Sequence, residues 1–210
     1  MSVTGIRATV IEDSLRQLAF FRQEQGIRKY LSEVQRVLED VPIESVQHVV
    51  TILLSAYLED RHIFIMGNGG SAATASHFAN DLNKAASGDC EKRFRAIALT
   101  DNVPLLTAWG NDLSYEDIFL EQLKNLYGDG SVVIGISGSG NSENVLKALR
   151  FARNNGGIPI GFTGFAGGKI KSVVEECIVV PSCCMAQIED VHLVLEHLIC
   201  TVLREEVARL

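Results

Sequence analysis

The chain has 210 residues, of which 47% are hydrophobic, and carries a formal net charge of −7 at pH 7. It can bury a full core, and because no linker rich in proline, glycine or serine divides it, a single structural domain is expected. The acidic balance without a basic stripe argues against nucleic-acid binding. No signal peptide is recognisable and no apolar run is long enough to span a bilayer, so we expect a cytoplasmic protein that does not act at membranes.

Apolar residues at helical spacing dominate the first 60 residues. One helix is predicted from about residue 14 to 39, with a break at Gly26, and a second from 42 to 58. The first helix is unusually apolar, with Leu18, Phe20, Phe21 and Tyr30 clustered. We therefore expect part of residues 1–60 to pack against another subunit; the alternative is that these helices cover one face of a sheet.

Short apolar strands alternate with helical segments over residues 61–210. Strands are predicted at 62–66, 94–99, 131–136, 158–162 and 176–180, and helices at 70–84, 103–111, 114–126, 141–155 and 185–208. Such alternation is typical of a parallel sheet covered on both faces. The predicted fold class is α/β, most simply a doubly wound sheet of five strands.

The first of these strands ends in a glycine turn. Gly67, Gly69 and Gly70 permit a tight turn before an alanine-rich helix. Either Asn68 or Ser71 is expected to cap that helix, whose unpaired N–H groups attract phosphate or carboxylate. This segment predicts an anion site.

A second loop of the same kind follows the third strand. It reads Ser137-Gly-Ser-Gly-Asn-Ser142 and combines three hydroxyl groups with glycines that let backbone N–H groups approach an anion. Two such loops on neighbouring strands would converge where open α/β sheets bind ligands. The loop has no Walker-type lysine, which argues against hydrolysis of nucleoside triphosphates.

Ionisable residues in two predicted helices are candidates for chemistry. His77 and Asp81 are four residues apart and share one helix face, which is either an acid/base pair or a polar outer surface. In the last helix an inward apolar stripe is expected at Ile188, Val191, Leu195, Leu198 and Val202. Glu189, His192, Glu196 and His197 are expected on its other faces. Asp101, after the second strand, either caps the next helix or accepts hydrogen bonds from sugar hydroxyls.

The five cysteines are odd in number and form no C-x-x-C pair, so a disulfide scaffold is not expected. The adjacent pair Cys183-Cys184 could supply a nucleophile or a metal ligand. The favoured interpretation is that both are small buried residues in a reducing compartment.

Four motifs in this order resemble sugar isomerase (SIS) domains of the phosphoheptose isomerase type. They are Gly67-Asn-Gly-Gly-Ser-Ala72, His77-x-x-x-Asp81, Ser137-x-Ser-Gly-Asn-Ser142 and Ile188-x-x-Val-His192-x-x-x-x-His197. The resemblance extends from about residue 45 to the C-terminus. It implies a flavodoxin-like five-stranded sheet with extra helices, a homotetramer, a zinc-associated site, and interconversion of sedoheptulose 7-phosphate with a heptose 7-phosphate.

The resemblance also implies roles for individual residues. Substrate contacts would come from Asn68, Gly69, Gly70, Ser71, Asp81, Asp101, Asn102 and Glu189, with Ser137, Gly138, Ser139 and Ser142 around the phosphate. The metal ligands would be His77, Asp81, Glu189 and His197. Asp81 would be the catalytic base and His197 its acid partner in an isomerisation through a cis-enediol.

The chain departs from the family pattern at three of these positions. Asp81 stands where the family has a glutamate, Glu189 where it has a glutamine, and Gly138 where it has a threonine. The two carboxylates could compensate for each other in a ligand set of two histidines and two carboxylates. However, Glu189 and His197 are eight residues apart, about 12 Å along a continuous helix, so either the helix begins after Glu189 or two subunits share the site.

Three alternatives remain open from the sequence. The chain could isomerise a different phosphosugar, or it could be a non-catalytic SIS regulator that binds a sugar phosphate or a replication initiator protein. A dinucleotide-binding oxidoreductase is disfavoured, because the acidic residue expected after Gly67-x-Gly69-x-x-Ala72 falls at Asp89 in a polar loop. The histidines paired with carboxylates favour an enzyme over a regulator.

Overall fold

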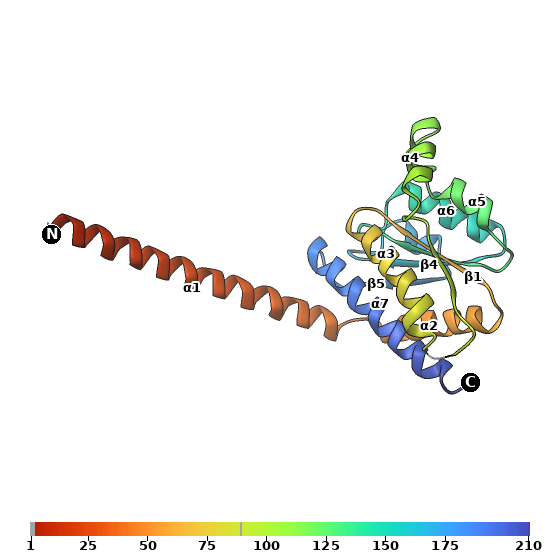
Figure 1. Cartoon of the computed structure of the whole chain (residues 1–210), viewed down its shortest axis with the longest axis horizontal. Coiled ribbons are helices and arrows are strands. Elements are labelled where there is room, and N and C mark those ends of the chain that lie inside the picture. Colours follow the sequence, from red (N-terminus) through yellow and green to blue (C-terminus); the bar gives the residue numbers. More distant parts are fainter. Residues whose placement is uncertain (1–2, 89) are drawn as a thin grey trace. The chain divides into compact units, whose positions relative to one another are not determined.

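The computed structural model describes the backbone of residues 3–88 and 90–210, and side chains from residue 20 onward, again without residue 89. Contacts group the chain into two units, residues up to Glu39 and residues 40–210. The first unit is one helix, α1 (Val3–Glu39), which continues through Gly26 (Figure 1). The predicted break is therefore wrong: a glycine inside a helix costs about 1 kcal/mol but does not end it.

The α1 helix carries the large apolar side chains on which the prediction of subunit contacts rests. Phe20, Phe21 and Tyr30 are exposed on it, whereas the side chain of Leu18 lies outside the described residues. No single helix among the described residues is long and apolar enough to cross a membrane.

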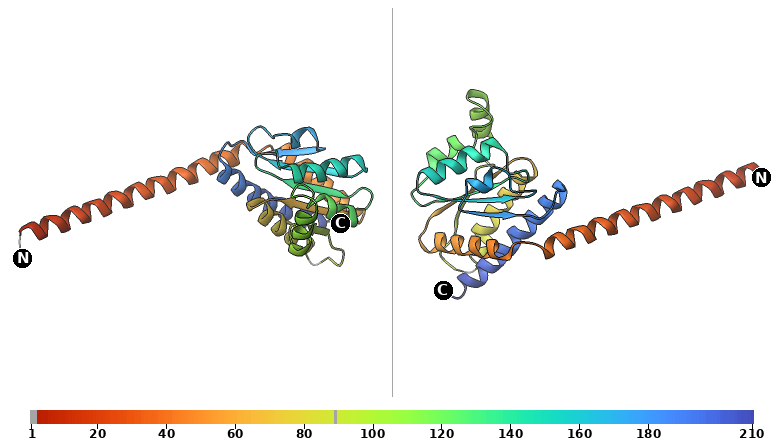
Figure 2. Two further views of the ribbon diagram at one scale, coloured as in Figure 1. Left: turned by 90° about the horizontal axis from the view of Figure 1, so that it is seen from above. Right: turned by 180° about the vertical axis from the view of Figure 1, so that it is seen from behind.

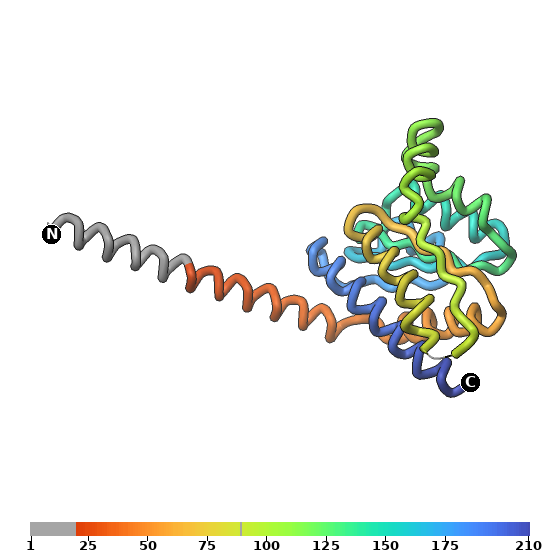
Figure 3. The backbone as a smooth tube through the Cα atoms, viewed as in Figure 1, coloured from red at the N-terminus to blue at the C-terminus, as the bar shows by residue number. Residues whose placement is uncertain are grey.

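Residues 40–210 alternate between strands and helices as the sequence predicts (Figure 3). The elements are α2 (Ile43–Leu58), β1 (His62–Gly67), α3 (Gly70–Asp81), a π-helical turn η1 (Leu82–Ala86), β2 (Arg95–Ala98), α4 (Val103–Asp112), α5 (Leu120–Leu126), β3 (Val132–Ile136), α6 (Glu143–Asn154), β4 (Ile158–Thr163), a 3-10 turn η2 (Ile170–Ser172), β5 (Glu176–Val179) and α7 (Met185–Val207). The helix predicted over 114–126 begins only at Leu120, because residues 115–119 form turns.

The five strands form one parallel sheet in the order β2-β1-β3-β4-β5. This is the flavodoxin-like doubly wound order, so the predicted fold class is confirmed. The order reverses between β1 and β3, where Ile63 pairs with Val132 and Gly67 with Ile136. The loops that follow these two strands therefore start side by side at the carboxyl edge of the sheet.

Helices cover both faces of the sheet (Figures 1 and 2). On one face α2, α3 and α7 pack together, and on the other α5 packs on α6. Because α2 contacts α7 and β5, it belongs with the sheet, and the unit boundary lies at residue 39 rather than at the predicted 60. The core between the sheet and α5 and α6 includes Phe64, Met66, Leu146 and Leu149, each of which contributes roughly 1.5–3 kcal/mol by its burial.

Candidate active site

The glycine turn and the serine loop meet through a pair of asparagines. The side-chain amide of Asn68 donates to Oδ1 of Asn144 at 2.9 Å, and the amide of Asn144 donates back to Oδ1 of Asn68 at 2.8 Å. Asn144 is in the first turn of α6 and is buried. The convergence of the two loops, predicted from their strands, is thus held by a reciprocal hydrogen bond.

The glycine turn leads into α3 without a side-chain cap. Gly69 is the N-cap residue and has φ +55°, a conformation that favours glycine, and no side chain caps the helix. The prediction that Asn68 or Ser71 caps α3 is therefore wrong: Asn68 is held by Asn144, and Ser71 lies buried inside the first turn. A hollow of about 410 Å³ lies between this turn and α4, lined in part by Asn68, Thr100 and Tyr115.

The serine loop is a compact turn in front of α6. Its hydroxyls Ser137 Oγ and Ser142 Oγ lie 3.0 Å apart, and the backbone N–H of Gly140 donates to the carbonyl of Ser137. Ser142 is the N-cap residue of α6, yet its side chain makes no cap hydrogen bond. The N-terminus of α6 and the hydroxyl groups beside it can therefore receive an anion.

The first turns of α7 reach both loops. A methyl group at Gly138 would lie 2.4 Å from Sδ of Met185, and one at Gly70 would lie 2.7 Å from Oε2 of Glu189. The Glu189 carboxylate thus sits over the first residue of α3, at the positive end of that helix. The negative charge of Glu189 disfavours a phosphate at the start of α3 in the same subunit, so the serine loop is the more favourable phosphate site.

Further along, α3 and α7 bring two histidines and two carboxylates together. Nε2 of His77 lies 3.4 Å from Nε2 of His197 and 3.7 Å from Oδ2 of Asp81. Nε2 of His197 lies 3.9 Å from Oδ2 of Asp81 and 3.6 Å from Oε2 of Glu196. One donor atom from each of these four residues lies within 4.8 Å of every other.

The four side chains differ in exposure. The two histidine side chains are about half exposed, at 43% and 51%, Asp81 is 18% exposed, and Glu196 is fully buried. Burial, followed by the negative charge of Asp81, raises the pKa of the Glu196 carboxyl to about 8. The cluster therefore opens to solvent on its histidine side and is closed behind Glu196.

This donor set fits a divalent metal of the zinc type. Imidazole nitrogen and carboxylate oxygen are ordinary zinc ligands, and a tetrahedron with bonds of about 2.1 Å has edges of about 3.4 Å. The four measured separations, 3.4 to 3.9 Å, are close to that edge. Three of the four predicted ligands, His77, Asp81 and His197, are thus brought together in one chain.

Glu189, the fourth predicted ligand, is not part of this cluster. The α7 helix begins at Met185, before Glu189, and continues to Val207. The sequence left two explanations for the 12 Å between Glu189 and His197. The first, that the helix begins after Glu189, is therefore wrong. Within one chain Glu189 lies at Gly70, two helical turns from His77.

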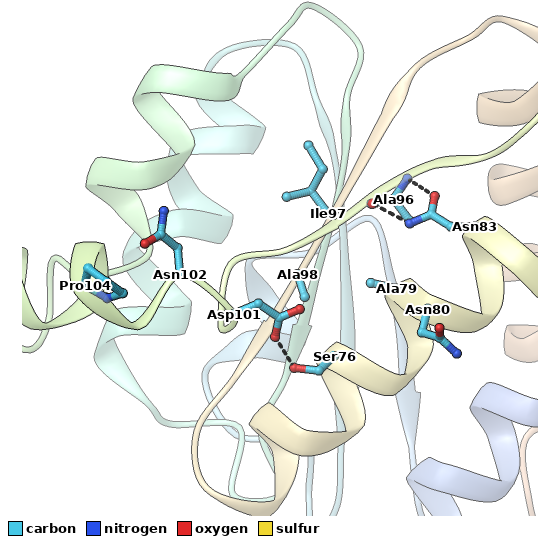
Figure 4. A pocket seen from close by; sticks show the side chains of 10 residues that line it. All are labelled: Ser76, Ala79, Asn80, Asn83, Ala96, Ile97, Ala98, Asp101, Asn102 and Pro104. Atoms are coloured by element: carbon cyan, nitrogen blue, oxygen red, sulfur yellow. Dashed lines mark hydrogen bonds between the residues drawn. The ribbon is translucent and has the colours of Figure 1, made fainter.

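The polar residues after β2 are occupied by local contacts. Asn102 is the N-cap of α4 and its Oδ1 accepts from the N–H of Leu105 at 3.2 Å, so the capping role considered for Asp101 belongs to Asn102. Asp101 instead accepts from the hydroxyl of Ser76 (Figure 4) and from that of Thr100. Asp101 and Asn102 line a hollow of about 620 Å³ at the edge strand β2. His77 and His197 do not line this hollow.

Three residues of this region are not predicted by the sequence motifs. Two are Asn144 and Tyr115; the Tyr115 hydroxyl donates to Oδ1 of Asn68 at 2.8 Å. Glu196 was expected on an outer face, but it is buried, while the supposedly inward Leu198 and Val202 are partly exposed. The position of Glu196 next to His197 was the available signal.

Two other expectations resolve into structural roles or fail. His192 is buried, and its Nε2 donates to the carbonyl of Thr163 at 3.1 Å, so it serves the core rather than the cluster. The expectation of buried thiols at Cys183 and Cys184 is wrong, because both are exposed ahead of α7; Cys200 is buried, and burial raises its pKa.

Comparisons with known proteins agree with these motifs. Residues 29–164 match the SIS domain family. The phosphoheptose isomerase of Clostridium acetobutylicum is 36% identical over 184 residues, which are 87% of this chain and 93% of that protein. The chain belongs to the SIS domain family.

Other relatives of this SIS domain carry the same name. The phosphoheptose isomerase of a Nitratiruptor species is 40% identical over 187 residues, 86% of this chain and 98% of that protein. The solved structure of phosphoheptose isomerase from Neisseria gonorrhoeae has a TM-score of 0.80 and 32% identity, covering 86% of this chain and 98% of its own. The family and the fold inferred from the sequence motifs are confirmed.

Proposed function

We propose that this SIS domain protein is a phosphosugar isomerase that converts sedoheptulose 7-phosphate to D-glycero-D-manno-heptose 7-phosphate through a cis-enediol. The relatives that share 36–40% of its sequence over most of their length are named phosphoheptose isomerases. The observation that carries the proposal is the pairing of an anion-receiving serine loop with a separate histidine–carboxylate cluster in the same chain.

The serine loop would bind the phosphate. Ser137, Ser139 and Ser142 supply hydroxyl groups, and the start of α6 supplies backbone N–H groups that the side chain of the N-cap residue Ser142 does not occupy. Gly69, which has open space beside it, lets the sugar chain approach the backbone of the first loop, and Asn68 is held there by Asn144. Two turns of α3, about 10 Å, separate Gly70 from His77, which suits a long-chain phosphosugar held at one end and reacting at the other.

Asp81 and His197 would move the protons. The Asp81 carboxylate is partly exposed and can take the proton from the carbon beside the carbonyl, and His197, with its Nε2 3.9 Å from Asp81, can pass a proton between the two oxygens. Holding the phosphate fixes the reacting carbons against these groups, which lowers the entropic part of the barrier.

We also propose that the cluster binds zinc. His77, Asp81 and His197 would hold it, and the proposal is supported by the two buried oxygens of Glu196 beside them, which have no hydrogen-bond partner among the described residues. When bound, a zinc ion that accepted the substrate oxygen as a further ligand would polarise the substrate carbonyl and stabilise negative charge on the enediolate.

The active protein is proposed to be a homo-oligomer, a tetramer by the family resemblance. Supporting this, Leu198 and Val202 of α7 and Ile43 of α2 are exposed and border an apolar hollow of about 570 Å³. An apolar surface of this kind is typical of subunit contacts.

The test is an isomerase assay on the purified protein with sedoheptulose 7-phosphate, run as purified, after chelation and after zinc is restored. Formation of the aldose, lost on chelation and recovered with zinc, is the expected result. Equilibrium binding of the phosphosugar without any turnover would overturn the enzymatic proposal, and turnover that survives full chelation would remove zinc from it.

A further inference from the structure

Glu196 is the least satisfied polar side chain near the histidines. It is fully buried on α7, and neither carboxylate oxygen has a hydrogen-bond partner among the described residues. A buried carboxylate without a partner is costly, and native structures normally supply a donor or a cation. The same carboxylate contacts two groups of the cluster, His197 at 3.6 Å and the negatively charged Asp81.

The neighbours of Glu196 do not offer the missing partner by themselves. Asp81 repels the charged form of Glu196 and can share a hydrogen bond with it only when one of the two carboxyl groups holds a proton, and Cys200, one turn further along α7, is a buried thiol. His197 faces Glu196 with the same Nε2 that lies 3.4 Å from Nε2 of His77. The two histidine Nε2 atoms and one oxygen each from Asp81 and Glu196 converge on one point. A single imidazole proton cannot satisfy all four atoms, whereas one divalent cation can.

We propose that Glu196 is the fourth protein ligand of a divalent metal site contained within one subunit, completing the set His77, Asp81 and His197 in place of Glu189. This inference rests on the zinc site of the proposed function and names its ligands. Two neutral imidazoles and two carboxylates balance the charge of the ion, so the buried side of the site carries no net charge when it is filled.

The position of Glu189 supports the exchange. Its carboxylate lies over Gly70, and about 12 Å of continuous helix separates it from His197. In this structure the Glu189 carboxylate lies at Gly70 and His197 lies at His77, so the group of donor atoms around His197 does not include Glu189. Glu196 lies next to His197 and has its carboxylate on the same side as Asp81, so one subunit supplies four ligands without a second copy.

The experiment compares metal binding by Glu196→Gln and Glu189→Gln, using protein stripped of metal and titrated with Zn²⁺ and with Co²⁺. Glutamine at either position keeps the side-chain volume and removes the anionic ligand. We expect one ion per chain in the wild type, a Kd raised at least 100-fold in Glu196→Gln, and a Kd within about 3-fold of wild type in Glu189→Gln. The visible spectrum of bound Co²⁺ should change in Glu196→Gln and stay unchanged in Glu189→Gln.

A second variant guards against misfolding. Glu196→Leu removes the buried charge, so the metal-free protein should melt at a temperature equal to or above that of the metal-free wild type while losing metal affinity. Unchanged Zn²⁺ affinity in both Glu196 variants, loss of affinity in Glu189→Gln alone, or no metal binding by the wild type would each overturn the assignment.

Turnover separates this inference from the proposed function. If the wild type binds one ion through Glu196 but does not isomerise sedoheptulose 7-phosphate, the proposed function fails and the ligand assignment stands. If the wild type isomerises the sugar while Glu196→Gln binds metal as tightly as wild type, only the ligand assignment fails.

Discussion

Asp81 has two proposed roles, as the catalytic base and as a metal ligand. It is close to both histidines and to Glu196, and it projects from the last turn of α3, just before the π-helical turn η1. An aspartate is one methylene shorter than the glutamate of the family pattern. The short distances within the cluster show that α3 and α7 approach closely enough for the shorter side chain to reach His77 and His197.

Replacing Asp81 by asparagine should lower kcat by roughly 10²–10⁴-fold, because the amide cannot accept the substrate proton. Binding of sedoheptulose 7-phosphate, measured by calorimetry, should remain within a few-fold of wild type, since the phosphate is held elsewhere. The control is Lys84→Ala, an exposed position one turn further along the chain, which should keep wild-type kcat. Near-normal turnover in Asp81→Asn would remove Asp81 from the mechanism.

His192 should make stability depend on pH. Burial lowers its pKa to about 4, against an ordinary value of 6.5. The unfolded chain binds the His192 proton more tightly than the folded chain does. The contribution of His192 to the free energy of unfolding is therefore constant above pH 6.5 and decreases as the pH falls from 6.5 toward 4. From pH 7 to pH 5 it should remove about 2 kcal/mol from the free energy of unfolding, measured with urea at one protein concentration.

The matched variant is His192→Gln, which keeps a donor for the carbonyl of Thr163 and cannot titrate. Its loss of stability between pH 7 and pH 5 should be smaller than that of wild type by about the same 2 kcal/mol. Equal pH dependence of the two proteins would show that the burial of His192 does not exclude its charged form.

At the scale of elements, the sequence predicts the two loops at the carboxyl edge of the sheet. It does not predict which face of α7 is buried. The strands β1 and β3 are apolar throughout, and each ends in glycine-rich sequence, so their positions and the convergence of the loops follow from the chain. The α7 helix, in contrast, has apolar residues on two faces. Ile199 and Leu203 are buried, whereas Leu198 and Val202, at the same spacing, are partly exposed.

That ambiguity explains the missed ligand. Choosing Leu198 and Val202 as the inward stripe rotates the helix and turns Glu196 outward, whereas the true stripe buries it beside Asp81. Periodicity alone cannot separate two apolar faces, because each satisfies the same spacing. Only packing against α3 decides which one faces the core.

Gly140 should be essential to the serine loop. It has φ +66°, and a methyl group there would lie 2.2 Å from the carbonyl oxygen of Gly167. Gly140→Ala should therefore displace the loop, destabilise the fold by more than about 1–3 kcal/mol and raise KM for the phosphosugar more than it lowers kcat. Thermal melting and steady-state kinetics measure the two effects.

The control for Gly140→Ala is Gly156→Ala. Gly156 has a similar φ of +75° but open space where a methyl group would go, far from the loop in sequence. It should cost about 1 kcal/mol and leave KM unchanged. An equal change in KM for both variants would mean that the serine loop does not hold the phosphate.

At the scale of the whole molecule, the exposed apolar face shared by α2 and α7 is the main feature that a single chain leaves unexplained. Leu198 and Val202 lie on α7 within one or two turns of His197, so contacts made by this face would also steady the cluster. The sequence predicts subunit contacts within residues 1–60, a range that includes the α2 side of this face, but it gives no indication of the α7 side.

Val202→Asp should weaken the proposed oligomer, because it puts a charge into the apolar hollow between α2 and α7. Sedimentation velocity should show a smaller species than wild type at the same concentration. The matched control is Leu126→Asp, an exposed leucine at the end of α5, which should sediment as wild type. Identical sedimentation of both variants and wild type would place subunit contacts elsewhere.

The most direct test of the proposed chemistry is the reaction of sedoheptulose 7-phosphate with the zinc-loaded protein in D₂O, followed by NMR. An enediol mechanism removes a proton from C1 of the ketose and predicts the aldose 7-phosphate with deuterium at C2, because the proton delivered to C2 comes from a group that exchanges with solvent. Aldose formed without any deuterium, or no aldose at all with excess enzyme, would contradict the account.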